Sequence, residues 1–187
     1  MSDVLQAKAF SGWRDYYEMC KPRVVLLMLL CTLVGMFLAT NESVPFDLIV
    51  YCLVGVALVA GSAAALNHLV DASVDQKMAR TEQRPVAQGR VSMTQGLMFV
   101  AATGGLGLVI LAFLVNPLTA GLNFLAWLGY GVIYSLYLKR ATSQNIVIGG
   151  AAGAFPPMVG WVAASGSVSI EAIGMFMLIF MWTPPHF

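Results

Sequence analysis

Long runs of apolar residues alternate with short polar connections along this chain. There are six runs, and they extend over Val24–Ala39, Leu48–Val70, Met93–Val115, Leu118–Leu138, Ile146–Ala164 and Ile170–Trp182. A helix needs about 20 apolar residues to cross a bilayer, and the runs are near that length. The pattern therefore predicts a multi-span bundle with six transmembrane helices.

Proline and aromatic residues refine this picture at the ends of the runs. Asn116-Pro117 predicts a tight turn, and Pro156-Pro157 and Pro184-Pro185 are expected to kink or break their helices. Ser11–Cys20 mixes aromatic with charged side chains, as a helix lying at the membrane interface does. We expect an interfacial segment over residues 1–23 and one membrane domain over 24–187.

Composition agrees with a membrane protein and excludes several other classes. Hydrophobic residues make up 59% of the chain and charged residues 10%, whereas soluble domains carry about 25% charged residues. The net charge of +1 gives no reason to expect nucleic acid as a partner. The three cysteines, Cys20, Cys31 and Cys52, lack metal-binding spacing and are expected to pack as small hydrophobic residues. The fold class is therefore an all-α integral membrane protein.

Basic residues indicate how the bundle is oriented. If the N-terminus is cytoplasmic, all ten fall on the cytoplasmic side: Lys8, Arg14, Lys21, Arg23, Lys77, Arg80, Arg84, Arg90, Lys139 and Arg140. Cytoplasmic loops collect Lys and Arg in this way. The sequence predicts a multi-pass protein with a cytoplasmic N-terminus.

A polar stripe stands at the end of the second run. Asn67, Asp71 and Asp75 are spaced four residues apart, so on a helix each turns only about 40° from the last and all three share a face. Carboxylates about 6 Å apart repel, but a divalent cation reverses the sign of that interaction. Hard oxygen ligands suit Mg²⁺, which completes its shell with water and substrate phosphate. The stripe is therefore a candidate Mg²⁺ site.

Cations follow this stripe directly. Lys77, Arg80 and Arg84 have the chemistry that binds phosphate oxygens, and on a continued helix the two arginines would form a second stripe. The alternative is that the carboxylates simply pair with these arginines on a solvated loop. Together, the acidic and basic groups at a membrane edge favour a lipid-linked diphosphate as the ligand.

The segment Asn67–Pro85 resembles the first aspartate-rich motif of the UbiA superfamily of intramembrane prenyltransferases. Within it, Met78-x-Arg80-Thr81-x-x-Arg84-Pro85 is similar to the branch that makes heme O, the protoheme IX farnesyltransferases. Supporting segments are Lys21-Pro22-Arg23, Tyr134-x-x-x-Leu138-Lys139-Arg140-x-Thr142-x-x-Asn145 and Trp182-Thr-Pro-Pro-His-Phe187. The resemblance covers residues 21–187.

The resemblance implies nine transmembrane helices around a cavity open to lipid and to the cytoplasm of a bacterial inner membrane. It implies transfer of a farnesyl group from farnesyl diphosphate to a vinyl group of heme b, with Mg²⁺ as the cofactor. Asn67, Asp71 and Asp75 would hold the metal and diphosphate, helped by basic residues and by Tyr134 and Lys139. Lys21, Arg23, His68 and His186 are candidate heme contacts, and heme-handling or oxidase-assembly proteins are candidate partners.

The resemblance implies two further expectations. The superfamily has a second aspartate-rich motif after the sixth helix, so we expect this chain to be C-terminally truncated and inactive alone. Alternative functions are transfer of a polyprenyl chain to a quinone precursor, transport gated by the proline-broken helices, and a purely structural membrane subunit. A structural subunit predicts that Asp71→Asn is silent, and transport leaves the acidic stripe unexplained.

Overall fold

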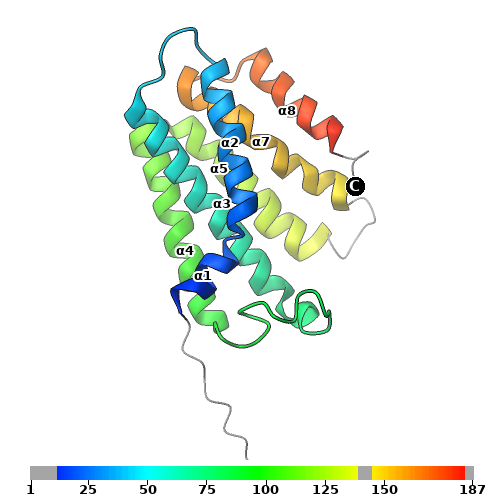
Figure 1. The fold of residues 1–187 in the computed structure, drawn as a ribbon. Helices are drawn as coiled ribbons and strands as arrows, with labels where there is room; N and C mark the ends of the chain where they lie inside the picture. Colours follow the sequence, from blue (N-terminus) through cyan, green and yellow to red (C-terminus); the bar gives the residue numbers. More distant parts are fainter. Residues whose placement is uncertain (1–11, 139–144, 184–187) are drawn as a thin grey trace, which may run out of the picture.

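The computed structural model describes residues 12–138 and 145–183 of this chain, and within them every regular element is helical (Figure 1). The elements in order are α1 (Trp13–Met19), α2 (Pro22–Leu38), α3 (Phe46–Asp75), α4 (Met93–Ile110), η1 (Leu111–Val115), α5 (Pro117–Trp127), η2 (Leu128–Leu138), α7 (Asn145–Ser165) and α8 (Ile170–Trp182). Here η marks a π-helix. These bounds agree closely with the six apolar runs, and α1 lies where an interfacial helix was expected.

Polar side chains fix where several helices begin. Ser92 accepts a hydrogen bond from the Gln95 N–H, and the Gln95 side chain accepts one from the Ser92 N–H, which completes a capping box for α4. Asn116 caps α5 by accepting from the Thr119 N–H at 2.7 Å, with Pro117 in the first helical position. The expected turn at Asn116-Pro117 is therefore confirmed.

Length and apolar composition together identify the described helices that could cross a membrane by themselves. Within the described residues, α3 and the continuous helix Met93–Val115 meet that condition. The bent pair of α1 and α2 adds a third, with an angle of 55° between its halves, whereas α8 has only 13 residues. The all-α membrane fold is confirmed, and two or three of the six predicted spans meet this condition within the described residues.

The helix α7 runs unbroken through Pro156 and Pro157, so the expected break does not occur there. A membrane helix tolerates proline where a neighbouring helix packs against the affected turn. Here α2 supplies that neighbour at very short range. A Cβ atom on Gly35 would collide with the Pro157 carbonyl, and one on Gly160 with the Thr32 carbonyl. The expected break at Pro184-Pro185 lies outside the described residues.

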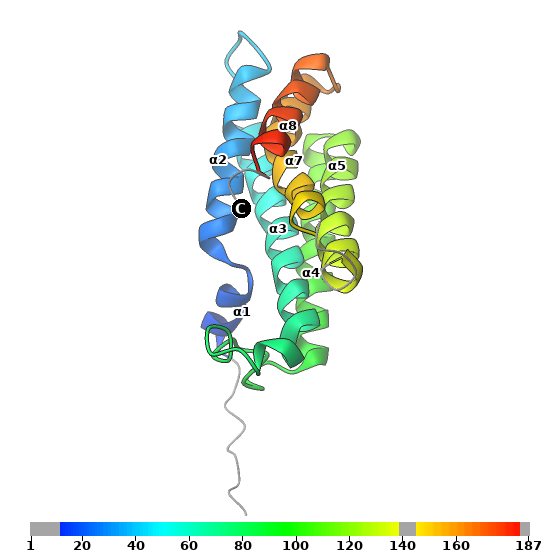
Figure 2. The same cartoon turned by 90° about the vertical axis from the view of Figure 1, so that its right-hand side faces the viewer.

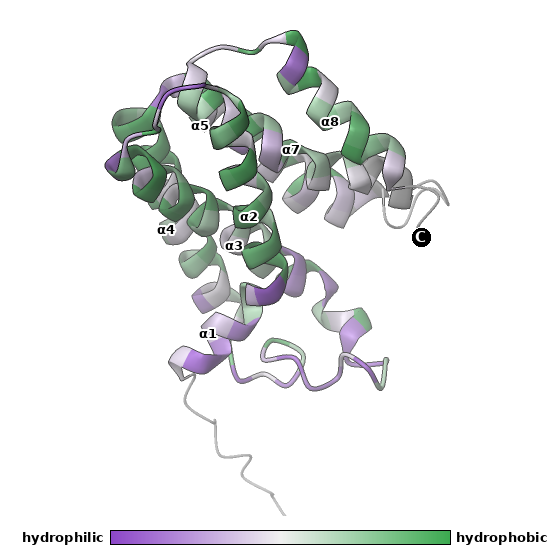
Figure 3. Cartoon of the chain, turned by 45° about the horizontal axis from the view of Figure 1, so that its top comes forward, coloured by the Kyte–Doolittle hydropathy of each residue, from purple (hydrophilic) through white to green (hydrophobic). Residues whose placement is uncertain are grey.

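The two ends of the bundle differ in character. One end holds α1 and the long connection between α3 and α4 (Figure 2). Both are largely polar in the hydropathy view (Figure 3). The sides of the bundle are apolar and exposed, as shown by Leu26 (69% exposed), Phe113 (82%) and Leu178 (71%). Such a surface requires a lipid environment.

The helix α3 ends at Asp75, and residues 76–91 form turns. The second stripe that a continued helix would have formed from Arg80 and Arg84 is therefore absent. Arg80 is exposed, while Arg84 folds back toward α3 and is half-buried. Successive turns, closed by bonds such as Thr81 N–H to Met78 O at 2.9 Å, replace the helix.

Candidate functional site

The polar stripe of α3 is buried at the end of the bundle. Asn67, Asp71 and Asp75 have residue exposures of 5%, 3% and 4%. Buried carboxylates cost free energy unless they are paired or coordinated. Each of these side chains consequently has a polar partner: Asp71 accepts from Asn67 of the same helix, whereas Asn67 and Asp75 also have partners from other parts of the chain.

Asn67 is the centre of one group of contacts. Its Oδ1 accepts a hydrogen bond from Lys21 Nζ at 2.7 Å. Its Nδ2 donates to Asp71 Oδ2 at 3.0 Å and to Ser135 Oγ at 3.2 Å. Ser135 Oγ in turn donates to the Tyr130 carbonyl at 2.8 Å. The start of α2, the end of α3 and the π-helix η2 therefore meet around one amide.

Asp75 is the centre of a second group. Arg84 Nη1 donates to Asp75 Oδ2 at 2.7 Å, and the two side chains are 25% and 5% exposed. Thr81 Oγ1 donates to the Asp75 carbonyl at 3.3 Å. The alternative in which an arginine pairs with a carboxylate is thus realised for Arg84, although the carboxylate is buried and not solvated.

The charges around the stripe balance. Asp71 and Asp75 contribute two negative charges, and Lys21 and Arg84 contribute two positive charges. A dication and an anionic diphosphate can therefore enter together without leaving a large excess of either sign. Fixed cations at both ends of the stripe are suited to a ligand that carries several phosphate oxygens.

The donor set of the stripe also fits Mg²⁺. It offers two carboxylates and an amide oxygen, which are hard ligands from one helix face. Residues 12–138 and 145–183 contain no group of three or more His, Cys, Asp or Glu residues that could hold a metal. A metal at the stripe would therefore need ligands from water or phosphate, as Mg²⁺ usually does.

Other residues predicted for the site are distributed around it. Tyr134 stacks on Tyr130 with ring centroids 5.6 Å apart, and Gly149 packs so closely that a Cβ there would lie 2.7 Å from the Tyr134 ring. Lys77, like Arg80, is exposed in the connection after α3, and Arg23 is exposed at the start of α2. Lys139 and His186 lie outside the described residues.

His68 is buried beside the stripe, with 3% exposure, and its Nδ1 atom has no hydrogen-bond partner in the described part of the chain. Lys21, by contrast, contacts Asn67 directly, so it lies next to the polar stripe whether or not it also contacts heme.

Ser135 was missed by the sequence reasoning. A serine in an apolar run gives no signal, because its partner is 68 positions away.

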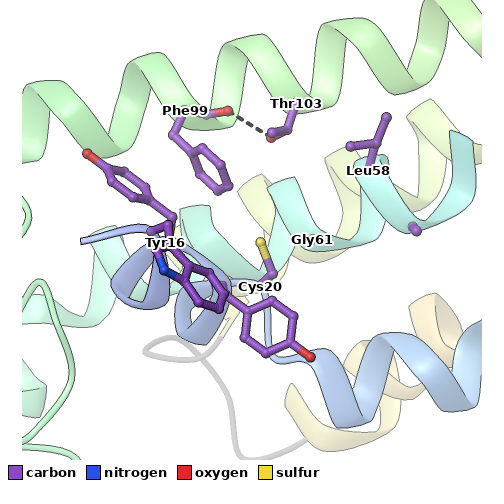
Figure 4. Close-up of a pocket in the computed structure, with 9 residues that line it drawn as sticks. Tyr16, Cys20, Leu58, Gly61, Phe99 and Thr103 are labelled. Carbon is purple, nitrogen blue, oxygen red and sulfur yellow. Dashed lines mark hydrogen bonds between the residues drawn. The ribbon is translucent and has the colours of Figure 1, made fainter. Parts of the chain in front are cut away.

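A separate cavity of about 450 Å³ lies between α1, α3 and α4 (Figure 4). Tyr16, Cys20, Leu58 and Phe99 are among its nine lining residues, none of which is charged. This lining therefore offers no cation to balance the charge of a diphosphate. It therefore differs from the polar stripe, although both adjoin the connection between α1 and α2.

Comparison with known proteins assigns the family. The profile of the UbiA prenyltransferase family matches residues 28–187. The chain is similar to curated proteins named protoheme IX farnesyltransferase from Hahella chejuensis (50% identity over 187 residues) and Legionella pneumophila (57% over 175 residues). These matches cover 100% and 94% of this chain, and 62% and 60% of the relatives, so the chain spans about three fifths of their length.

Solved structures show the same fold at low sequence identity. A UbiA homologue from Archaeoglobus fulgidus bound to GPP and Mg²⁺ has a TM-score of 0.73 and 19% identity, over 92% of this chain and 62% of that one. A digeranylgeranylglyceryl phosphate synthase structure has a TM-score of 0.75 and 15% identity, over 90% and 58%. Together with the family profile and the curated relatives, they establish that this chain belongs to the UbiA prenyltransferase family.

Proposed function

We propose that the protein containing this chain is a protoheme IX farnesyltransferase of the inner membrane. It would transfer the farnesyl group of farnesyl diphosphate to a vinyl group of heme b, giving heme O. The buried stripe of Asn67, Asp71 and Asp75 between two fixed cations carries this proposal. The names of the curated relatives support heme b as the acceptor.

The diphosphate would bind at the stripe together with Mg²⁺. The metal would supply positive charge to the leaving group when bound. Asn67, Asp71 and Asp75 would hold it through oxygen atoms. Lys21 and Arg84, which contact Asn67 and Asp75 in this structure, would reach the phosphate oxygens. The exposed Lys77 and Arg80, with Tyr134 and Lys139, are proposed as further diphosphate contacts.

The reaction needs little covalent chemistry from the protein. The bond between C1 of the allylic chain and the diphosphate oxygen breaks, and the electron pair leaves with the diphosphate. Lys21 and Arg84 would interact more strongly as negative charge grows on that group, which lowers the barrier selectively. Apolar walls would keep water from the allylic cation until the π electrons of the acceptor vinyl group form the bond to C1. The cation that this leaves on the vinyl carbon next to the ring would then take up water, which releases a proton and becomes a hydroxyl group.

Heme O formation tests this proposal. Membranes containing the full-length protein would be incubated with farnesyl diphosphate, Mg²⁺ and heme b, and heme O followed by chromatography. We expect formation that falls about 100-fold or more with Asp71→Asn. Turnover of a quinone precursor in place of heme b would contradict the acceptor but keep the diphosphate site. Unchanged activity of Asp71→Asn would contradict the site itself.

A further inference from the structure

Two different segments bring cations to the polar stripe. Lys21 belongs to the short connection between α1 and α2, and its Nζ atom reaches Asn67. Arg84 belongs to the connection between α3 and α4, and its guanidinium reaches Asp75. Neither segment is part of the helix that carries the stripe's side chains. Something must therefore fix the two segments relative to each other.

An ion pair joins these two segments directly. Arg90 Nη1, near the end of the α3–α4 connection, donates to Asp15 Oδ1 in α1. The second guanidinium nitrogen, Nη2, donates to the Gln83 carbonyl at 2.9 Å, one residue before Arg84. The other carboxylate oxygen of Asp15 accepts from the Gly12 N–H at 3.0 Å. Arg90 thus ties α1 to the backbone that positions Arg84.

The burial of Asp15 indicates that this pair is more than a surface contact. Asp15 is 7% exposed, although α1 has only seven residues and lies at the polar end of the bundle. A buried carboxylate is destabilising without its partner. Exposed ion pairs contribute little to stability. We expect this of Glu18, which is 4.0 Å from Arg90 and has a side chain that is 52% exposed.

Apolar packing alone holds α1 incompletely. The cavity of about 450 Å³ lies between α1 and the helices beneath it (Figure 4). Met19 is fully buried and shares a cluster with Val86 and Val91 of the α3–α4 connection. Those apolar contacts also join α1 to the α3–α4 connection. The polar pair and Met19 therefore act on the same two segments.

The backbone at Lys21 makes its position depend on α1. Lys21 has a φ of 50°, the one positive value found for a non-glycine residue in the described ranges. This conformation is disfavoured for an L-residue, so surrounding contacts must hold it. Because α1 ends only two residues earlier, a displacement of α1 would move Lys21 away from Asn67.

We propose that Asp15 and Arg90 are positioning residues for the diphosphate site. Their ion pair holds α1 against the α3–α4 connection, and this keeps Lys21 and Arg84 in contact with the stripe. This inference rests on the proposed function, because the ligand it serves is the prenyl diphosphate. Neither residue touches that ligand. Their effect passes through Lys21 and Arg84.

The test uses the full-length protein and separates diphosphate binding from turnover. Mg²⁺-dependent binding of farnesyl diphosphate would be measured without acceptor, and KM and kcat would then be measured with heme b. Asp15→Asn and Arg90→Gln should each weaken diphosphate binding and raise its KM at least about fivefold, as expected for coupling between sites, with kcat changed less. The charge-reversed double variant Asp15→Arg with Arg90→Asp should recover most of the loss. Glu18→Gln, the matched control, should stay within about twofold of wild type.

Each contrary outcome has a distinct meaning. If the wild type binds no prenyl diphosphate, the proposed function is wrong, and the positioning role of the Asp15–Arg90 pair is wrong with it. If the wild type binds it and the folded single variants have the same affinity and KM as the wild type, only the positioning role of the ion pair is overturned. A double variant as impaired as the singles would also overturn it. Should Asp15→Asn fail to fold, Asp15→Glu provides the second variant, because it keeps the charge and must retain near-normal KM.

Discussion

Lys21 places its ammonium group 2.7 Å from Asn67 Oδ1, in a backbone conformation that L-residues rarely adopt. A strained backbone at a polar cluster is typical of functional sites. On our account this geometry keeps a positive charge where the diphosphate's charge grows during ionisation. The neighbouring Arg23 carries the same charge but is exposed. Removing each charge in turn therefore compares a cation at the stripe with one outside it.

Lys21→Met should therefore lower kcat/KM for farnesyl diphosphate by roughly tenfold or more in the full-length protein, because one donor to the leaving group is lost. Arg23→Met removes an equal charge and, at saturating heme b, should change kcat/KM for farnesyl diphosphate less than about twofold. Steady-state kinetics on both variants check this. Equal losses in the two variants would indicate a general electrostatic effect and contradict a specific role for Lys21.

Ser135 is a second single residue that supports the stripe, because it orients the side chain of Asn67. It accepts from Asn67 Nδ2 and donates to the Tyr130 carbonyl while being fully buried. Ser135→Ala should leave Asn67 under-satisfied and cost about 1 kcal/mol of unfolding free energy. Thermal unfolding in detergent measures this. Ser73→Ala, at an exposed position of α3, is the control and should be nearly neutral.

At the scale of elements, the crossing of α2 and α7 depends on glycine. Added Cβ atoms at Gly35 and Gly160 would meet backbone carbonyls of the opposite helix, which cannot move aside as a side chain could. Small residues allow this close approach between helices in lipid. The contact also covers the turn that contains Pro157, where α7 has lost backbone donors.

Gly160→Ala should accordingly destabilise the protein by about 3 kcal/mol, while Gly153→Ala should have little effect. Gly153 lies two turns earlier in α7, and a Cβ there would meet nothing within 4 Å. Thermal unfolding of both variants in one detergent gives the comparison. A Gly160→Ala protein as stable as Gly153→Ala would show that the crossing is looser than described.

The apolar runs and the composition predicted the helices well, because the length of a run and a turn such as Asn116-Pro117 are local signals. The stripe of Asn67, Asp71 and Asp75 was also predictable, since its spacing lies within one helix. The contacts of Lys21, Ser135 and Asp15 were not, because each joins segments 46 to 75 residues apart. The ion pair that Arg84 makes with Asp75 at the end of α3 was likewise not predictable, because the turns that bring Arg84 back have no local pattern.

For the whole molecule, the two ends of the bundle carry different charge. The described basic residues lie in α1, at the start of α2 and in the α3–α4 connection, whereas the opposite end carries Glu42, Asp47 and Glu171. The positive-inside rule predicts that the basic end, and with it the polar stripe, faces the cytoplasm. Both substrates would then approach from that side or from the bilayer.

Cysteine labelling in intact cells tests this orientation. In a background lacking native cysteines, Glu42→Cys should react with a membrane-impermeant maleimide, and Gln83→Cys should react only after the membrane is permeabilised. Both positions are exposed in the connections at opposite ends. Labelling in the reverse order would place the stripe outside the cytoplasm and contradict the proposed access of the substrates.

The central claim is that the α3 stripe holds a prenyl diphosphate through Mg²⁺. Its most direct test is a titration of farnesyl diphosphate binding against Mg²⁺ concentration, using full-length wild type, Asp71→Asn and the control Ser73→Ala. We predict that wild type and Ser73→Ala bind tightly only with Mg²⁺, that EDTA reverses binding, and that Asp71→Asn loses about 100-fold in affinity. Binding that is independent of Mg²⁺, or unchanged in Asp71→Asn, would contradict the account.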